Sequence, residues 1–172
     1  MSEYIIAVDK FDKEIAPIEK MEAHYNGVLH RAFSILVFNS NNKLLLQKRN
    51  SNKYHSPGLW TNTCCSHPRF GENLQNAIYR RLHEEMGFNC ELREIFSFTY
   101  NVEFDDRISE NEYDHVFIGT YDGKVIPNTE EVEDFKWISI DEIKADMKNN
   151  PDLYTYWFKC LLDKIDFRRF LL

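Results

Sequence analysis

The sequence has few cysteines, no long apolar run and no excess of positive charge, and each of these absences excludes a class of protein. The four cysteines form no CxxC pair, so neither a disulfide framework nor a zinc knuckle is expected. The longest uncharged apolar runs, such as residues 32–38, are far shorter than the roughly 20 residues of a membrane span. The N-terminus has acidic residues early and no basic segment before an apolar one. We therefore expect no targeting peptide and a cytoplasmic location.

The balance of charges is acidic. With 21 Lys and Arg against 28 Asp and Glu, the formal net charge is −7, and such a chain repels polyanions. We therefore expect no nucleic-acid partner, and a phosphate-bearing ligand would need a local basic cluster or a metal ion. The 172 residues, 43% of them hydrophobic, predict one core and a single domain over residues 1–172.

Strand-like and helix-like segments alternate along the chain, which predicts an α+β fold with a mixed or antiparallel sheet. Strands are predicted at residues 4–8, 31–38, 43–49, 91–104, 110–121 and 134–140, a short edge strand running into a helical turn at 14–27, and helices at 73–86, 141–150 and 153–165. Residues 31–38 and 43–49 form the clearest predicted hairpin, and residues 105–109 an acidic turn. Residues 52–72 make a long loop rich in reactive side chains, which is typical of functional loops.

Two glutamates stand in the motif ENE on a predicted strand. Because residues two apart on a strand share a face, the carboxylates of Glu110 and Glu112 project together, and Asp114 could be a third. Paired carboxylates bind a metal or share protons, but a solvated outer face is the commoner role of such residues.

Histidines lie beside the same features. His24 lies in the predicted helical turn, His30 at the start of the predicted hairpin and His67 in the reactive loop. Together with Glu110 and Glu112 they would make a nitrogen and oxygen site for a divalent ion such as Mn²⁺, Zn²⁺ or Mg²⁺. The alternative is that the three are unrelated surface or capping residues.

The loop also contains adjacent cysteines. In an extended segment their side chains point in opposite directions, so Cys65, and not Cys64, shares a side with His67. A thiol there could be a nucleophile, a metal ligand or a proton donor. The alternative is a pair of small buried hydrophobic residues.

The predicted helix at 73–86 carries a charged pair on its apolar side. Helical spacing places Arg81 and Glu85 among Leu74, Ile78 and Leu82, inward or along the rim, which favours an ion pair in a site or a metal ligand over the alternative of an i,i+4 surface ion pair. Basic residues in segments that flank the suspected site could form an anion pocket, although each could equally be a surface charge: Lys20, Arg49, Lys53 and Arg81.

Four longer motifs follow one another in the chain. They are GVLHRAFSILVFNSNNKLLLQKR, then K-x-x-x-PG-x-W-TNTCCSHP, then E-x-x-x-x-A-x-x-RR-L-x-x-E-x-G, and finally ENE. Together they closely resemble the type 1 isopentenyl-diphosphate isomerases, from about Tyr4 to Trp157. The resemblance implies a Nudix-like α/β/α sandwich with a mixed central sheet, and interconversion of isopentenyl and dimethylallyl diphosphates without a redox cofactor.

The resemblance also implies roles for single residues. Cys65 and Glu112 match the two acid/base residues, and Tyr100 matches an active-site tyrosine and Trp157 a substrate-facing tryptophan. The residues of the family's metal site match His24, His30, His67, Glu110 and Glu112. The family's glutamate that holds a second Mg²⁺ together with the diphosphate matches Glu85. The family's diphosphate-binding residues match Lys20, Arg49, Lys53 and Arg81. The partner implied is a small isoprenoid diphosphate, and we expect a monomer or a weak homo-oligomer.

The signature of Nudix hydrolases, laid over residues 66–88, is damaged. Ser66 replaces its first glycine, Arg81 replaces a glutamate, and Phe88 stands at its last aliphatic position. Losing a carboxylate and gaining a cation removes part of the metal cradle that hydrolysis of a diphosphate requires.

Three functions are therefore compared. The isomerase accounts for the motifs, and a proton donor and acceptor would move the double bond through a tertiary carbocation. A Nudix-type hydrolase of another organic diphosphate is the alternative enzyme, which Ser66 and Arg81 disfavour. A metal-binding regulatory domain would leave Cys65 and the basic residues without a role.

Overall fold

The computed structural model describes residues 2–104 and 107–170, in which nine strands, four α-helices and two 3-10 helices are found. Their order is β1 (Tyr4–Val8), β2 (Glu14–Glu19), α1 (Lys20–Asn26), β3 (His30–Phe38), β4 (Lys43–Arg49), β5 (Trp60–Thr61), β6 (Cys64–Ser66), α2 (Leu74–Met86), β7 (Leu92–Glu103), β8 (Ser109–Thr120), β9 (Val132–Ser139), α3 (Ile140–Asn149), η1 (Pro151–Leu153), α4 (Tyr156–Lys164) and η2 (Phe167–Arg169).

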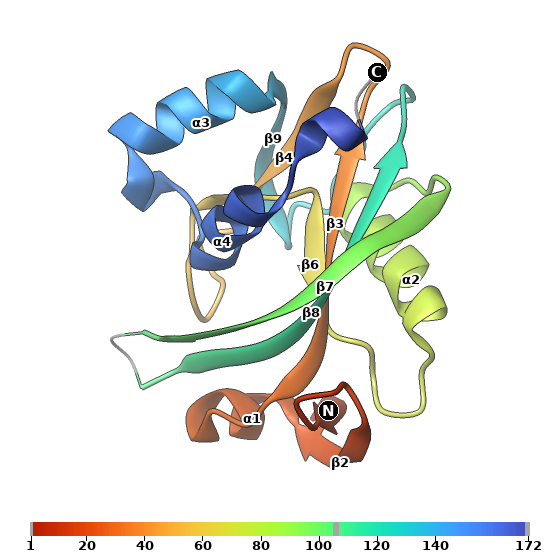
Figure 1. Cartoon of the computed structure of the whole chain (residues 1–172), viewed down its shortest axis with the longest axis vertical. Helices are drawn as coiled ribbons and strands as arrows, with labels where there is room; N and C mark the ends of the chain where they lie inside the picture. The colour runs from red at the N-terminus through yellow and green to blue at the C-terminus, as the bar shows by residue number, and fades with distance from the viewer. Residues whose placement is uncertain (1, 105–106, 171–172) are drawn as a thin grey trace.

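The sheet is mixed, and β3 runs through its middle (Figure 1). β3 is parallel to β8 from His30↔Glu112 to Phe38↔Thr120, and antiparallel to β6. β7 pairs with the other edge of β8, and β9 pairs with β4. This arrangement brings the start of β3, the start of β8 and β6 to one region of the sheet.

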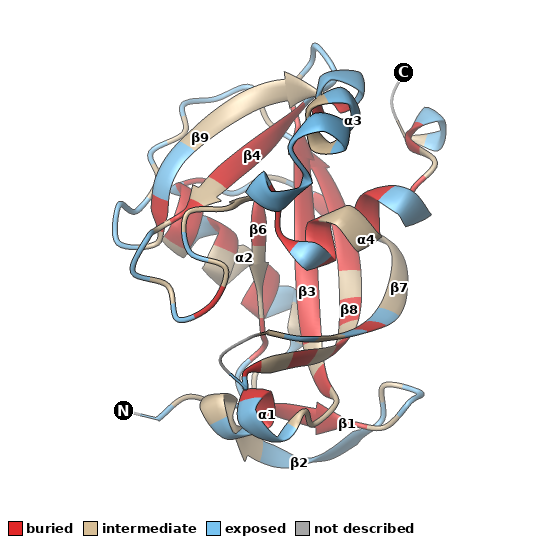
Figure 2. Ribbon diagram, turned by 90° about the vertical axis from the view of Figure 1, so that its left-hand side faces the viewer, coloured by how far each residue is buried: buried red, intermediate tan, exposed pale blue. Residues whose placement is uncertain are grey.

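The predicted hairpin of residues 31–38 and 43–49 is confirmed at its turn, but its two strands do not pair along their length. The two strands form, but β3 and β4 pair only at Phe38↔Leu44. β3 is apolar on both faces and buried along nearly its whole length (Figure 2), so it needs strand neighbours on both edges. β8 and β6 fill those edges, and β4 turns away to pair with β9.

Helices cover both faces of the sheet. Phe33, Ile35 and Val37 of β3 pack in one core with α2, whereas Leu36 and Phe38 pack in a second core with α4. The period-two alternation of a strand places these residues on opposite faces. Figure 1 shows α2 on one side of the sheet and α3 and α4 on the other, the predicted α/β/α sandwich.

Helix α2 follows the predicted bounds because both of its ends are capped. The side chain of Asn73 accepts a hydrogen bond from the backbone N–H of Asn76. Gly87 ends the helix at φ 76°, and a Cβ there would lie 2.1 Å from the carbonyl oxygen of Ile126. Glu85 is buried on the inner side of this helix, as its spacing predicts.

Other segments differ from the prediction in part. The predicted loop at 52–72 contains the short strands β5 and β6, and the predicted helix at 153–165 begins only at Tyr156, after a 3-10 turn at η1. Of the predicted acidic turn, Asp105 and Asp106 lie outside the described residues. No helix in the described part of the chain has the length and apolar character needed to cross a membrane.

Candidate active site

A cavity of about 60 Å³ opens between the first half of β8, β6, α2 and α4. Its lining residues are Lys20, Gln47, Arg49, Lys53, Tyr54, His55, Cys65, Ser66, His67, Arg81, Glu85, Tyr100, Glu110, Glu112 and Trp157. The candidate residues predicted from the sequence line it except Asp114, which lies elsewhere, and His24 and His30, which lie beside His67. The fold therefore gathers the predicted set at one place.

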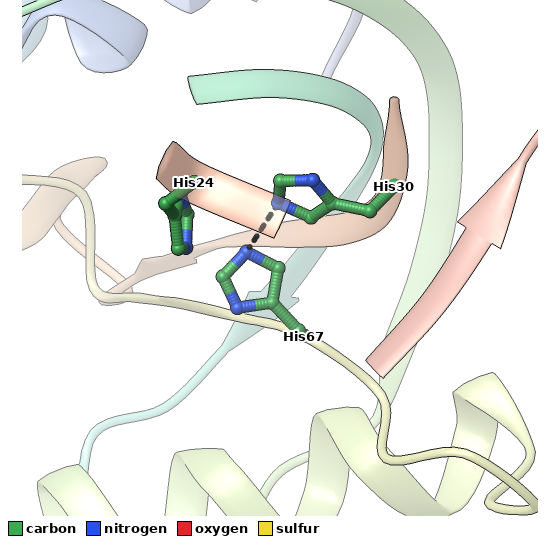
Figure 3. Close-up of side chains that lie close together, drawn as sticks. All are labelled: His24, His30 and His67. Carbon is green, nitrogen blue, oxygen red and sulfur yellow. Dashed lines mark hydrogen bonds between the residues drawn. The ribbon is translucent and has the colours of Figure 1, made fainter. Parts of the chain in front are cut away.

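Three imidazoles face one another next to this cavity (Figure 3). His24 comes from α1, His30 from the first position of β3, and His67 from the segment after β6. One ring nitrogen from each lies within 4.8 Å of the others, and all three residues are buried. Three nitrogen donors at this spacing are compatible with a divalent metal ion.

Hydrogen bonds on the far side of two rings fix their orientation. Nδ1 of His24 donates to the carbonyl of Ser109 (3.0 Å), and Nδ1 of His30 donates to the carbonyl of Val28 (2.7 Å). Each ring then presents an unprotonated Nε2 to the centre. Nε2 of His30 lies 3.2 Å from Nε2 of His67, an arrangement suited to two lone pairs that share a cation.

Carboxylates complete this centre. Oε1 of Glu112 lies 2.9 Å from Nε2 of His67 and 3.5 Å from Nε2 of His30. The Tyr100 hydroxyl donates to Glu112 (2.6 Å) and is 3.0 Å from Glu110, so it bridges the two glutamates. Because β8 places Glu110 and Glu112 on one face, both point inward as the sequence predicts, and both are buried.

Burial sets the protonation of this group. It lowers the pKa of His67 to about 3, which leaves the imidazole neutral at pH 7 and able to bind a metal ion. Burial, and then the charge of Glu112, raises the pKa of Glu110 well above its usual value. Burial alone would raise the pKa of Glu112 too, but the imidazoles of His67 and His30 lower it overall. The two carboxyl groups therefore have opposite shifts.

The adjacent cysteines face opposite sides of β6. Cys64 is fully buried in the core under α2, whereas Cys65 lines the cavity together with His67. The predicted division between the two side chains is confirmed. Burial raises the pKa of the Cys65 thiol, so it keeps its proton at neutral pH.

Four cationic side chains surround the outer part of the cavity. The Arg81 guanidinium contacts the carboxylates of Glu84 (2.8 Å) and Glu85. The ion pair of Arg81 with Glu85 is the one that helical spacing predicts. Arg49 donates instead to backbone carbonyls, those of His55 (3.0 Å) and Ser56 (3.1 Å). Lys53 and Lys20, like Arg49 and Arg81, line the cavity.

Trp157 is both a core residue and a wall of the cavity. It is 2% exposed and packs with the apolar residues of α4 and the sheet. The Arg49 guanidinium lies 5.2 Å from its ring centroid, and its indole Nε1 is buried without a hydrogen-bond partner in the described structure.

Sequence reasoning missed several residues of this site. His55 is buried, lies 3.1 Å from Glu110, and has a pKa that burial lowers to about 2. The Tyr54 hydroxyl lies 3.3 Å from Nε2 of His24, and Gln47 donates to Glu85. The only signal for Tyr54 and His55 was their place in the long loop after Lys53. Asp114, the third candidate carboxylate, bonds to Ser34 and does not line the cavity.

The chain is similar to proteins of known name. The family model of the NUDIX domain matches residues 28–158. The isopentenyl-diphosphate Delta-isomerase 2 of Photorhabdus laumondii is 49% identical over 168 residues, which cover 98% of this chain and 95% of that one. The isopentenyl-diphosphate Delta-isomerase of Burkholderia multivorans is 48% identical over 164 residues, with coverage of 95% and 93%.

Solved structures share the fold. A crystal structure from Deinococcus radiodurans superposes with a TM-score of 0.79 at 16% identity, covering 94% of this chain and 98% of that one. The MutT protein of Methanosarcina mazei superposes with a TM-score of 0.66 at 18% identity, covering 83% and 96%. At such identities the likeness concerns the fold alone.

Proposed function

Because this chain belongs to the Nudix family and, within it, to the isopentenyl-diphosphate Delta-isomerases, we propose that it interconverts isopentenyl diphosphate and dimethylallyl diphosphate. The observation that best supports the proposal is the meeting of one protonated thiol, Cys65, and one ionised carboxylate, Glu112, in a single buried cavity. Moving a double bond by one carbon requires one proton donor and one proton acceptor.

The proposed reaction uses these two groups in turn. The Cys65 thiol donates its proton to the terminal carbon of the alkene, which leaves a tertiary carbocation at the branched carbon. The Glu112 carboxylate then accepts a proton from the neighbouring methylene carbon, and the double bond forms there. For the reverse direction the two residues exchange roles.

The cavity wall protects the cation. Water would capture a carbocation as an alcohol, so the reacting carbons must be enclosed. Trp157 offers a ring face of negative potential to the developing charge, a role that fits its position beside the cavity. The Tyr100 hydroxyl, which donates to Glu112, holds that carboxylate in place.

The donor set fits a divalent metal ion. His24, His30, His67, Glu110 and Glu112 would hold it, because His24 and His30 already present an unprotonated Nε2 to the centre and Glu112 contacts His30 and His67. Mn²⁺, Zn²⁺ and Mg²⁺ all accept such mixed ligands. When bound, the ion supplies a fixed positive charge that favours the ionised form of the nearby carboxylates.

The outer part of the cavity is proposed to bind the diphosphate. Lys20, Arg49, Lys53 and Arg81 supply positive charge that the acidic chain as a whole lacks. Glu85 is buried beside Arg81 and would hold a second ion, Mg²⁺, together with the diphosphate.

The same contacts disfavour the hydrolase alternative. In the Nudix signature Glu84 and Glu85 would be metal ligands, but here Arg81 donates to both carboxylates. A cation in this place lowers the capacity of the helix to hold several metal ions.

One incubation tests the proposal. Purified protein with isopentenyl diphosphate and Mg²⁺ is expected to produce dimethylallyl diphosphate without release of phosphate. Release of inorganic phosphate or diphosphate would favour the hydrolase, and no conversion of any kind would favour a binding role.

We also propose that the protein is a single domain that acts in the cytoplasm as a monomer or a weak homo-oligomer. Sedimentation of the purified protein tests the oligomeric state.

A further inference from the structure

A second cavity, of about 590 Å³, lies outside the first and shares Lys20, Lys53, Ser66 and Arg81 with it. Arg69 adds a further cation to its wall, and Glu3 and Glu131 add two carboxylates. Three of the four cations of the first cavity, Lys20, Lys53 and Arg81, therefore also line this outer cavity.

The cations of the outer cavity are bridged in pairs by those two carboxylates. Glu3 contacts Lys20 (3.1 Å) and Arg69 (3.5 Å). Glu131 contacts Lys53 and Arg81, the latter at 3.4 Å. A carboxylate that spans two cations occupies the position that a phosphoryl group would need.

Glu131 is the better placed of the two to be exchanged. Its backbone is anchored on both sides, since its N–H donates to the carbonyl of Asn128 (3.0 Å) and its carbonyl accepts from the N–H of Asn50 (3.0 Å). Its side chain is 24% exposed, so solvent and an arriving anion can reach the carboxylate while the backbone stays fixed. Hydrogen bonds from Lys53 and the charge of Arg81 lower the pKa of Glu131 against the effect of burial, so the carboxylate is ionised.

We infer that Glu131 is a resident counter-anion of the diphosphate site, which the substrate displaces from Lys53 and Arg81 on binding. The inference rests on the proposed function, because it takes the outer cations as the diphosphate site. It makes Glu131 a specificity-determining residue. An anion must replace the contacts that Glu131 gives up, and a single phosphate replaces fewer of them than a diphosphate does.

The test measures binding of inorganic diphosphate and of inorganic phosphate by calorimetry in the presence of Mg²⁺. Glu131→Gln keeps the shape and the backbone contacts but removes the charge. It is expected to bind both anions about 3- to 10-fold more tightly than the unchanged protein, with phosphate gaining more than diphosphate. The preference for diphosphate over phosphate is therefore expected to fall.

Glu130→Gln is the matched control, since it makes the same charge change one residue away. Glu130 is exposed, and its carboxylate has no ion pair in the described part of the chain. Its anion affinities are expected to stay within about twofold of the unchanged protein. If Glu131→Gln binds the anions no more tightly than Glu130→Gln, while both melt at the same temperature, the inference is wrong.

A double variant separates the loss of the Glu131 charge from a general change in folding. In a Lys53→Met background, Glu131→Gln has one cation fewer to release, so its gain in affinity should shrink; an undiminished gain would contradict the exchange. Isomerisation by the unchanged protein is measured separately. Without isomerisation but with tighter binding by Glu131→Gln, the proposed function fails and the anion exchange stands. With isomerisation but no tighter binding, the exchange alone fails.

Discussion

The inner centre and the outer rim of the site are built in different ways. The inner centre consists of His24, His30, His67, Glu110, Glu112 and Tyr100, all of them buried. Its side chains hydrogen bond to one another or to backbone carbonyls. The outer rim consists of Lys20, Lys53, Arg81 and Glu131, whose long side chains are partly exposed and form ion pairs.

The difference indicates a division of work. A rigid, dry group of titratable side chains can hold a proton or a metal ion at a fixed place, which is what chemistry requires. A rim of long charged side chains can release one anion and accept another, which is what binding requires. Changes to the inner centre should therefore lower turnover, and changes to the rim should alter substrate affinity.

The largest effect is expected at the boundary of the two regions, at Cys65. Cys65→Ala removes the proposed proton donor and should lower turnover at saturating substrate by about 10²- to 10⁴-fold. Cys64→Ala is the matched control, because Cys64 lies on the opposite face of β6 in the core under α2. Steady-state kinetics of both variants checks this. Equal and mild losses would show that neither thiol carries the chemistry.

At the rim, Arg81→Ala should act on affinity. Charge-assisted contacts to phosphate contribute about 1.5–3 kcal/mol, so the Michaelis constant should rise roughly 10- to 100-fold with metal content at the histidines unchanged. Arg80→Ala is the control on the same helix, since Arg80 pairs with Glu72 and Glu84 and does not line the cavity. A Michaelis constant that does not change in folded Arg81→Ala would break the division between the regions.

The wall between the two regions gives a smaller effect. A cation–π contact in a dry site is worth about 2 kcal/mol, so Trp157→Leu should lower turnover about 30-fold and Trp157→Phe less. Phe158→Leu, in the same helix, packs in the core without lining the cavity and should lose stability but keep its turnover. Thermal melting and turnover are measured together. If activity in the Trp157 variants falls only in step with stability, Trp157 is a core residue and no more.

The last effect concerns stability rather than activity, and it depends on pH through the buried histidines. His67 and His55 have folded-state pKa values lowered to about 3 and about 2, so between about pH 6.5 and pH 3 the unfolded chain binds protons that the folded chain does not. Metal-free protein should therefore lose about 1.4 kcal/mol of unfolding free energy per pH unit for each such histidine as pH falls in that window.

Urea denaturation at pH 7, 6 and 5 with a chelator checks this expectation. His55→Gln should reduce the slope of unfolding free energy against pH by about 1.4 kcal/mol per pH unit, the contribution of one histidine. Lys53→Met at the rim should leave this slope unchanged. Unfolding free energies of the unchanged protein that do not vary with pH would show that the histidines are not held neutral by burial.

The sequence predicts much of the inner centre, and the reason is periodicity. The alternation of strands places Glu110 with Glu112 and separates Cys64 from Cys65, and helical spacing turns Glu85 inward. The residues that were missed, His55 and Glu131, stand in irregular segments whose position depends on the whole fold. No spacing rule connects Glu131 with Arg81 and Lys53, which lie far from it in the chain.

Strand pairing also shows that local sequence patterns do not predict contacts between distant parts of the chain. The turn at residues 39–42 predicts a local hairpin, but the pairing of β3 with β8 joins strands about 80 residues apart in the chain. That non-local pairing matters for the site, because it places His30 directly beside Glu112. The elements and the partners that follow one another in the chain, such as β7 and β8, were predictable from local patterns, but the non-local partners were not.

Isomerisation in heavy water tests most directly whether the inner centre transfers protons while the rim only binds. With isopentenyl diphosphate and Mg²⁺ in D₂O, the Cys65 thiol exchanges with solvent before it donates. Mass spectrometry of the product should then show dimethylallyl diphosphate carrying at least one deuterium on carbon, with the diphosphate intact. Product without deuterium, or a loss of phosphate from the substrate, would contradict the account.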